Sequence, residues 1–329
     1  MLETSPAKEE VLILNDENTA IAISNELNGA PKMSKQMKGF VLAIVGATLW
    51  GVSGTFGQFL FQQRGVNVEW LISVRMLISG SLLLLFSASR DLKGTFAILN
   101  SKKDFLQLVV FGITGMVAVQ YTYFAAIKHS NAATATILQF AGPVLIAIYL
   151  ALKNRRWPRS LEVLSIGLAV FGTFLLVTHG DLSRLSISKT AFIMGIASAL
   201  ALAIYTLQPV KLLKKYDSGI IVGWGMLIGG IAFSFIKAPW HAEGIWDNYS
   251  FISAAFIIIF GTLIAFYTYL TAVKLIGGQK SSLLASAEPL SAALLSVIWL
   301  KVPFHTVDWI GGLCIISTVF ILSRTGKSA

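Results

Sequence analysis

The chain has 329 residues, of which 55% are hydrophobic and only 13% are charged, and its formal net charge is +10. Soluble domains carry about 25% charged residues, so this composition excludes an ordinary soluble domain and predicts a membrane protein, in agreement with the mean hydropathy of +0.72. The single cysteine, Cys314, excludes a disulfide framework.

The N-terminal stretch differs from the rest of the chain. Residues 1–37 hold six acidic residues and no sustained apolar run, which predicts a disordered tail. A secretory signal peptide begins with basic residues, so this acidic beginning is not typical of one. Met33 and Met37 precede the first apolar segment, and each is an alternative start to Met1.

Charge-poor apolar segments then recur along the chain. A helix needs about 20 residues to cross a bilayer, and a membrane barrel would instead alternate apolar and polar residues over about 10. The segments therefore predict an all-α polytopic membrane protein with ten transmembrane helices, near 39–61, 70–89, 105–127, 131–152, 160–178, 190–210, 218–236, 250–273, 281–300 and 305–323.

The basic residues alternate with these segments. Most of the 26 Lys and Arg residues fall in loops on one predicted side, and only six fall on the other, namely Arg64, Lys128, Arg184, Lys189, Lys237 and Lys301. Basic loops stay in the cytoplasm, so both termini are predicted to be cytoplasmic. The positive charge thus reflects how the chain is oriented in the cytoplasmic (inner or plasma) membrane, and no nucleic-acid partner is expected.

A sequence repeat divides the chain. YTYFAAIKHS begins at Tyr121, YTYLTAVKLI begins 146 residues later at Tyr267, and the same offset joins Pro143 to Pro289. MLISG at Met76 likewise resembles MLIGG at Met226. The repeated unit is five helices, over residues 38–180 and 188–324, with residues 325–329 as a C-terminal tail.

The odd number of helices in each unit has a consequence for topology. The second unit must enter the membrane in the opposite orientation to the first, which makes the chain an inverted repeat around a central cavity. Inverted repeats are typical of secondary transporters that open one site alternately to either side of the membrane.

Four short motifs give the chain a family resemblance. They are GATLWG at 46–51, the arginine in SVRMLISG at 73–80, Pro143 in QFAGP, and AEP at 287–289. In this order, and with the repeat, they resemble the EamA-type ten-helix family of the drug/metabolite transporter superfamily over nearly all of the chain after residue 37. The resemblance implies a basket of helices around a cavity and export of amino acids or other small metabolites. Many relatives carry an acidic residue after helices four and nine, where this chain has KNRRWP and LKVP.

Two ionisable residues lie within the predicted spans. Such residues cost about 2.5–3.5 kcal/mol on insertion scales and are functional candidates by default. Glu288 lies near the middle of the membrane and is expected to bind a proton or the cationic end of a substrate, unless it only accepts hydrogen bonds at the Pro289 break. Arg75 is a candidate for a substrate carboxylate, with snorkelling to the headgroups as the alternative.

Uncharged residues complete the predicted site. One face of the predicted ninth helix is small and polar. It holds Ser281, Ala285, Glu288, Ala292 and Ser296. Pro143 and Pro289 are expected to loosen their helices and assist gating. Aromatic and amide residues are the remaining candidates for the cavity wall, although packing and interfacial anchoring are alternatives. The selected ones are Trp50, Gln120, Tyr121, Gln139 and Tyr267.

Enzymatic functions find little support in the motifs. RTGKSA has Ile321 where a phosphate loop begins with glycine. GVSG offers Ser53 as a nucleophile, but all four histidines fall at predicted helix ends or in loops. No catalytic residue, metal site or cofactor is predicted.

The function predicted from the sequence is secondary transport of a small metabolite, most simply an amino acid, in the direction of export. A facilitative channel and an exporter of small organic cations or drugs are the alternatives, and an intramembrane enzyme is a weaker one. The expected partners are a small-molecule substrate and the lipid bilayer, with protons as a candidate coupling ion. The oligomeric state is left open.

Overall fold

The computed structural model describes residues 34–179 and 187–325. Residues 1–37 and 38–329 form two separate units. In the first, the backbone N–H of Met37 donates to the Ser34 hydroxyl. Most of the predicted N-terminal tail, Met33, Arg184 and residues 326–329 lie outside the described residues.

Helices make up the second unit, and its described part contains no strand. In chain order the α-helices are α2 (Lys35–Gln58), α3 (Val68–Arg90), α4 (Leu92–Ala97), α5 (Lys102–Val110), α6 (Ala118–His129), α7 (Ala132–Gln139), α8 (Gly142–Lys153), α9 (Ser160–Thr178), α10 (Lys189–Leu207), α11 (Val210–Leu213), α12 (Ser218–Ser234), α13 (Asn248–Ile258), α14 (Ala265–Ile276), α15 (Gly278–Leu284), α16 (Ala287–Ile298) and α17 (Thr306–Thr325).

The helices account for every predicted apolar segment. Seven helical spans in the described residues are long and apolar enough to cross a membrane, counting stretches that join two or three elements. Three further apolar helices are shorter, at Ser160–Leu176, Ser218–Ser234 and Thr306–Thr318. The chain is therefore an all-helical, multi-pass membrane protein, and the number of ten spans stays a prediction.

Polar residues cap the helices where they leave the apolar layer. The Asn67 side chain accepts from the N–H of Trp70 at the start of α3, and Asn131 does the same for Thr134 at the start of α7. Side-chain oxygens in this position satisfy backbone donors that have no partner within the helix.

Two spans are broken rather than continuous. α7 ends at Gln139 and α15 ends at Leu284, each a few residues before a proline. A proline ring clashes with the carbonyl four residues earlier, which is Gln139 for Pro143 and Ala285 for Pro289. The face predicted for the ninth helix is therefore divided: Glu288, Ala292 and Ser296 belong to α16, whereas Ser281 belongs to α15 and Ala285 lies in the break.

π-helical stretches precede both Tyr-Thr-Tyr segments. Phe111–Val117 lies between α5 and α6, and Ile259–Ile264 lies between α13 and α14. A third stretch, Phe59–Gln63, extends α2. Wider turns of this kind are rare and occur often at functional sites, since they turn side chains and backbone groups out of the regular ladder.

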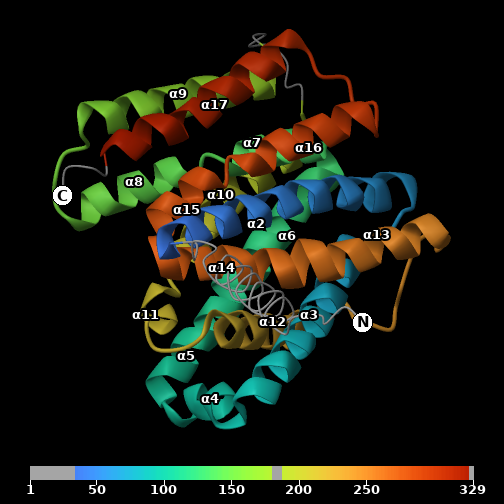
Figure 1. Cartoon of the computed structure of the whole chain (residues 1–329). Helices are drawn as coiled ribbons and strands as arrows, with labels where there is room; N and C mark the ends of the chain where they lie inside the picture. The colour runs from blue at the N-terminus through green and yellow to red at the C-terminus, as the bar shows by residue number, and fades with distance from the viewer. Residues whose placement is uncertain (1–33, 180–186, 326–329) are drawn as a thin grey trace, which may run out of the picture. The chain divides into compact units, whose positions relative to one another are not determined.

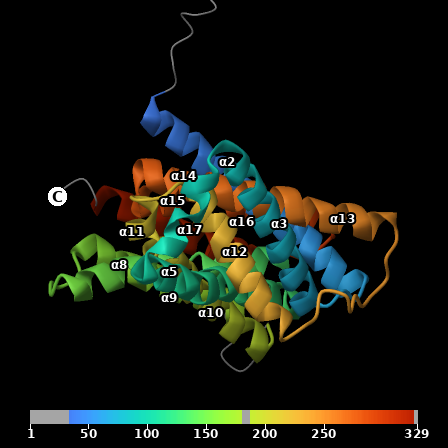
Figure 2. The ribbon, with the colours of Figure 1, turned by 90° about the horizontal axis from the view of Figure 1, so that it is seen from below.

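The packing within residues 38–329 interleaves the two halves of the sequence. α3 lies along α12, α9 along α17 and α6 along α10, and each pair takes one helix from either half. Figure 1 shows the α9–α17 pair as one outer layer and the α3–α12 pair on the opposite side, with α2, α6, α10 and α14 between them; Figure 2 gives the view from below. The middle helices therefore surround the centre of the bundle.

Glycines let the paired helices approach closely. A Cβ added at Gly80 of α3 would lie 2.7 Å from the Leu227 nitrogen of α12, and one at Gly172 of α9 would lie 2.6 Å from the Gly311 oxygen of α17. Small residues play this part in membranes, where burial of apolar area cannot drive helices together.

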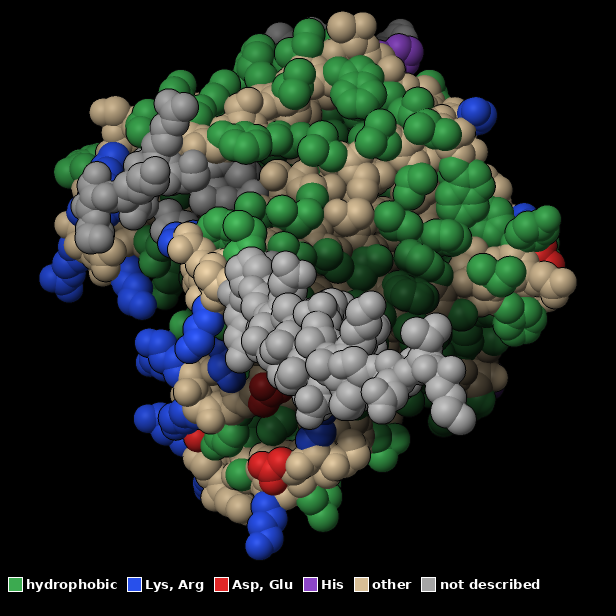
Figure 3. Space-filling model, in the orientation of Figure 1, with side chains coloured by type: hydrophobic (Ala, Val, Ile, Leu, Met, Phe, Trp, Pro, Cys, Tyr) green, Lys and Arg blue, Asp and Glu red, His purple; other side chains and the backbone are tan. Residues whose placement is uncertain are grey.

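The surface is sorted by charge. Hydrophobic side chains cover much of the visible face, and Lys and Arg gather along the left edge in Figure 3, where α8 ends and α5 begins in Figure 1. An apolar band beside a basic edge is the distribution expected for a protein placed across a bilayer.

The contact between α2 and α16 provides a test of the packing. A Cβ at Gly51 would overlap the Glu288 carbonyl oxygen and the Ser291 hydroxyl, whereas one at Gly167 of α9 would meet nothing within 4 Å. Gly51→Ala should therefore destabilise the fold by about 1–3 kcal/mol and Gly167→Ala should not. Thermal unfolding of both variants in the same detergent, followed by size-exclusion chromatography, measures this; equal midpoints would contradict the α2–α16 contact.

Candidate functional site

A buried cavity lies at the centre of the bundle. Its volume is about 30 Å³, enough for one or two water molecules. In this conformation the cavity is therefore much smaller than ligand sites, which enclose roughly 300–1,000 Å³. Seven helices supply the lining, through Trp50, Ser53, Arg75, Val119, Gln120, Tyr123, Phe124, Gln139, Leu202, Tyr205, Phe266 and Glu288.

Arg75 reaches this cavity from α3 and is 3% exposed. Its Nε donates to the Thr262 hydroxyl at 2.8 Å. Thr262, which lies in a π-helical stretch, in turn donates to the Ile257 carbonyl of α13. The guanidinium also lies over the Phe124 ring, 4.5 Å from its centroid. The side chain thus points into the bundle and does not snorkel to the headgroups.

Glu288 reaches the same cavity from the first turn of α16 and is also 3% exposed. The N-terminus of a helix favours a negative charge, because its first N–H groups have no partner within the helix. Across the described residues, no hydrogen bond or ion pair holds the Glu288 carboxylate. Arg75 is likewise in no ion pair there.

Tyr123 lines the same cavity as these two side chains. Its hydroxyl interacts electrostatically with both Glu288 and Arg75, and it shares a hydrogen bond of 2.7 Å with the Thr136 hydroxyl of α7. The cavity therefore carries a guanidinium, a phenol and a carboxyl group on three different helices, and among the described residues neither Arg75 nor Glu288 is in an ion pair.

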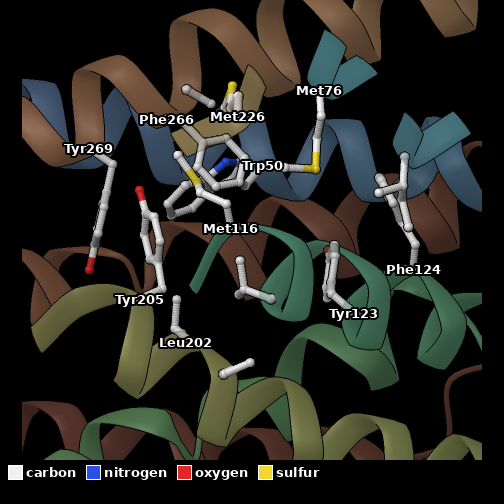
Figure 4. Close-up of a cluster of buried hydrophobic side chains, with 14 of the residues drawn as sticks. Trp50, Met76, Met116, Tyr123, Phe124, Leu202, Tyr205, Met226, Phe266 and Tyr269 are labelled. Carbon is white, nitrogen blue, oxygen red and sulfur yellow. The ribbon is translucent and has the colours of Figure 1, made fainter. Parts of the chain in front are cut away.

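An aromatic cluster closes one side of the cavity. Trp50 lies 4.9 Å from Phe266, 4.8 Å from Tyr269 and 6.3 Å from Tyr205, measured between ring centroids. Figure 4 shows these four rings together, with Tyr123 and Phe124 on the other side. The rings limit the space to small ligands and give it an apolar surface.

Several polar atoms of the wall have no partner among the described groups. They are Trp50 Nε1, Ser53 Oγ, Gln120 Oε1 and the Tyr205 hydroxyl, all buried. Buried polar atoms are nearly always hydrogen-bonded, so a set of unpartnered ones facing one cavity calls for a ligand or water. Both donors and acceptors are present in the set.

The cavity brings together five of the seven cavity residues expected from the sequence, namely Trp50, Arg75, Gln120, Gln139 and Glu288. Tyr121 and Tyr267 lie elsewhere. Tyr121 packs 5.5 Å from Phe233, and Tyr267 lines a different pocket.

The helical period explains the two misplaced tyrosines. Residues two apart on a helix point about 200° away from each other. Tyr123, two residues after Tyr121, faces the cavity, and Tyr269, two residues after Tyr267, joins the aromatic cluster. Phe124, Leu202 and Phe266 were missed altogether, because apolar side chains in apolar helices carry no signal that separates cavity from core.

Two further pockets lie toward the ends of the bundle. One of about 800 Å³ includes Gln58, Asn131, His179 and Asp308, and one of about 580 Å³ includes Arg90, Asp217 and Tyr267. The residue order along α2 and α3 places the central cavity between them, since Trp50 precedes Gln58 and Arg75 precedes Arg90.

Hydrogen bonds connect the helices at the end of the bundle where Gln58 lies. The Gln58 side chain accepts from the N–H of Ala132 and donates to Gln62, and Gln62 donates to the Ser130 carbonyl at 2.8 Å. These bonds hold the end of α2 against the turn between α6 and α7. Pro143 and Pro289 lie close to the cavity, beside the helix breaks next to Gln139 and Glu288.

Comparison with known proteins agrees with this architecture. The model of the EamA-like transporter family matches the chain twice, over residues 37–178 and 189–324. An uncharacterized inner membrane transporter of Salmonella typhimurium, YicL, is 40% identical over 299 residues, covering 90% of this chain and 98% of its own. An uncharacterized transporter of Bacillus subtilis, YetK, is 26% identical over 299 residues, covering 89% of each chain.

A solved structure described only as the crystal structure of a protein has a similar fold, with a TM-score of 0.61 at 16% identity over 89% of this chain and 97% of that one. The family matches together span most of the sequence and both halves of the helical bundle. They agree with an inner-membrane, multi-pass transporter. The chain belongs to the EamA-like transporter family.

Proposed function

We propose that the protein is a secondary transporter that exports a small zwitterionic metabolite, most simply an amino acid, through the central cavity by alternating access. The observation that carries this proposal is the presence of Arg75 and Glu288 in one cavity, with no ion pair to either among the residues that the structure describes. A buried, unpaired charge is costly, and two of opposite sign persist most readily if a ligand supplies both counter-charges.

A zwitterion fits this arrangement. Its carboxylate would accept from the guanidinium of Arg75, which keeps free donors beyond the bond to Thr262. Its ammonium would lie by Glu288 and the Tyr123 hydroxyl. The side chain of the ligand would face Trp50 and Phe266, which favours a small apolar or aromatic group.

Matching irregularities in the two halves support alternating access. The breaks before Pro143 and Pro289 and the π-helical stretches before Tyr121 and Tyr267 recur at corresponding positions. An inverted repeat, with broken helices at its centre, lets each half take the conformation of the other. The units at 38–180 and 188–324, each of five helices, are proposed as these halves, with both termini on the cytoplasmic side.

The described conformation supports an occluded state in this scheme. The aromatic cluster around Trp50 would be the gate toward one end pocket, and the Gln58–Ala132 contact would be the gate toward the other. The breaks at Pro143 and Pro289 would act as the hinges, because chain without a regular ladder absorbs rotation with little strain.

A second candidate substrate is a small organic cation. Glu288 lines the cavity together with Trp50 and interacts electrostatically with Tyr269, and aromatic rings beside a carboxylate suit a cationic ligand. The two substrate classes differ in their need for Arg75. A proton at Glu288 is a coupling option in either case.

Counterflow into proteoliposomes tests the substrate class with three matched ligands: a neutral aromatic amino acid, its decarboxylated amine and its N-acetyl derivative. Vesicles loaded with the unlabelled amino acid should accumulate its labelled form. Both analogues should exchange at least about tenfold more slowly, because each lacks one of the two charges. Equal exchange of the amine would favour the cation exporter. Uptake without counterflow would indicate a channel.

Substitution of the two charges should produce opposite selectivity. Loss of one member of a buried, bonded charge pair costs about 2–5 kcal/mol, so Glu288→Gln and Arg75→Gln should each slow zwitterion exchange by ~30-fold or more. Glu288→Gln should spare the N-acetyl ligand and Arg75→Gln should spare the amine. Arg64→Gln, which removes an arginine paired with Asp247 in a loop, is the matched control; equal losses in all three variants would refute the assignment.

Proton coupling has a separate test. If Glu288 carries the coupled proton, an imposed pH gradient should drive net transport by the wild-type protein and leave Glu288→Gln with exchange only, because glutamine cannot titrate. Net flux and counterflow measured in the same proteoliposome preparation distinguish the two. Gradient-driven flux by Glu288→Gln would assign the proton elsewhere.

A further inference from the structure

An apolar groove lies on the outside of the bundle between α8 and α10. Leu145 and Tyr149 of α8 form one wall, and Leu200, Ile204 and Leu207 of α10 form the other. The non-atom space is about 690 Å³, and Tyr149, Leu200 and Ile204 are 37–54% exposed. Exposed apolar residues on a membrane-length helix face the acyl chains of the bilayer.

The groove shares α10 with the central cavity. Leu202 and Tyr205 line the cavity, while Leu200 and Ile204 line the groove, so the helix separates the two spaces. α8 begins directly after the break that follows Gln139. A molecule in the groove would therefore contact two elements that also form the wall of the cavity.

One end of the groove is basic. The ammonium of Lys153 lies over the ring of Tyr149, 5.8 Å from its centroid. Lys211 follows three residues after Gln208, which lines the groove at the end of α10. Neither lysine is in an ion pair among the described residues. Nearby carboxylates are already engaged, Glu162 by Arg156 and Asp104 by Lys215.

The level of the headgroups is marked by Trp157. This residue follows α8 between Arg156 and Pro158 and is 94% exposed. Exposed tryptophan next to arginine is typical of the membrane interface. The groove thus runs from the apolar layer at Leu200 toward the interface at Lys153.

We propose that this groove binds an anionic phospholipid from the leaflet at the basic edge of the protein. An acyl chain would lie along Leu145, Leu200 and Ile204, and the phosphate would lie by Lys153 and Lys211. Gln208, whose Oε1 has no partner among the described groups, lines the groove near this end. Basic pockets between membrane helices bind anionic headgroups through this combination of charge and apolar area.

Native mass spectrometry of the purified full-length protein tests the site. The probe is an equimolar mixture of phosphatidylglycerol and phosphatidylcholine with the same acyl chains. The protein should retain phosphatidylglycerol in preference to phosphatidylcholine. Each basic group near a headgroup contributes about fivefold in affinity, so Lys153→Gln with Lys211→Gln should reduce the preference by ~25-fold.

Two further variants complete the design. Arg90→Gln with Lys93→Gln removes the same charge at the basic edge, on α3 and α4, and should leave the preference within about twofold. Ile204→Trp fills the groove from its exposed side and should reduce retention of both lipids. Equal retention of the two lipids by the wild-type protein, equal losses in both double variants, or unchanged retention by Ile204→Trp would each overturn the proposal.

Discussion

The burial of an arginine and a glutamate that do not pair with each other is the constraint on which the centre of this protein depends. Arg75 and Glu288 are each 3% exposed and line one cavity without forming an ion pair in the described structure. In an apolar layer, such groups attract each other strongly unless the scaffold holds them apart. The bond to Thr262 and the ring of Phe124 fix Arg75, and the first turn of α16 fixes Glu288.

The irregular backbone makes this separation possible. Thr262 can hold Arg75 because it lies in a π-helical stretch, and Glu288 lies at a helix start because Pro289 interrupts its span. Irregular backbone is tolerated at membrane depth only where it is enclosed by protein or lines a cavity. Close packing through glycine on either side supplies the rigid frame: α3 against α12, and α9 against α17. A binding site that moves during transport requires closely packed outer helices around inner helices that are interrupted.

Much of the fold was readable from the sequence, and less of the site. Hydropathy located the long apolar helices, because exclusion of charge from lipid is a strong constraint, whereas the short α4 lies between two predicted segments. The repeat of Tyr-Thr-Tyr identified the right helix segments, yet Tyr121 and Tyr267 were chosen where Tyr123 faces the cavity and Tyr269 joins the aromatic cluster beside it. Charge identified Arg75 and Glu288, since each is costly within a membrane. Phe124 and Phe266 could not be found, because only tertiary packing decides which apolar face lines a cavity. Pro289 was expected to loosen its helix, but the complete break at Ala285 was not predicted, since proline can bend a helix as well as end it.

Accessibility of the cavity from both sides of the membrane tests the central claim most directly. Cys314 is the only cysteine of the chain, so Cys314→Ala gives a background for a single reporter. Ser53→Cys places a thiol on the cavity wall, where the hydroxyl of Ser53 has no partner in the described part of the chain. A small, membrane-impermeant thiol reagent should label it in right-side-out and in inside-out vesicles, whereas Lys93→Cys and Lys237→Cys should each react from one side, and not the same one. Labelling of Ser53→Cys from one side only, with both controls behaving as expected, would contradict alternating access through this cavity.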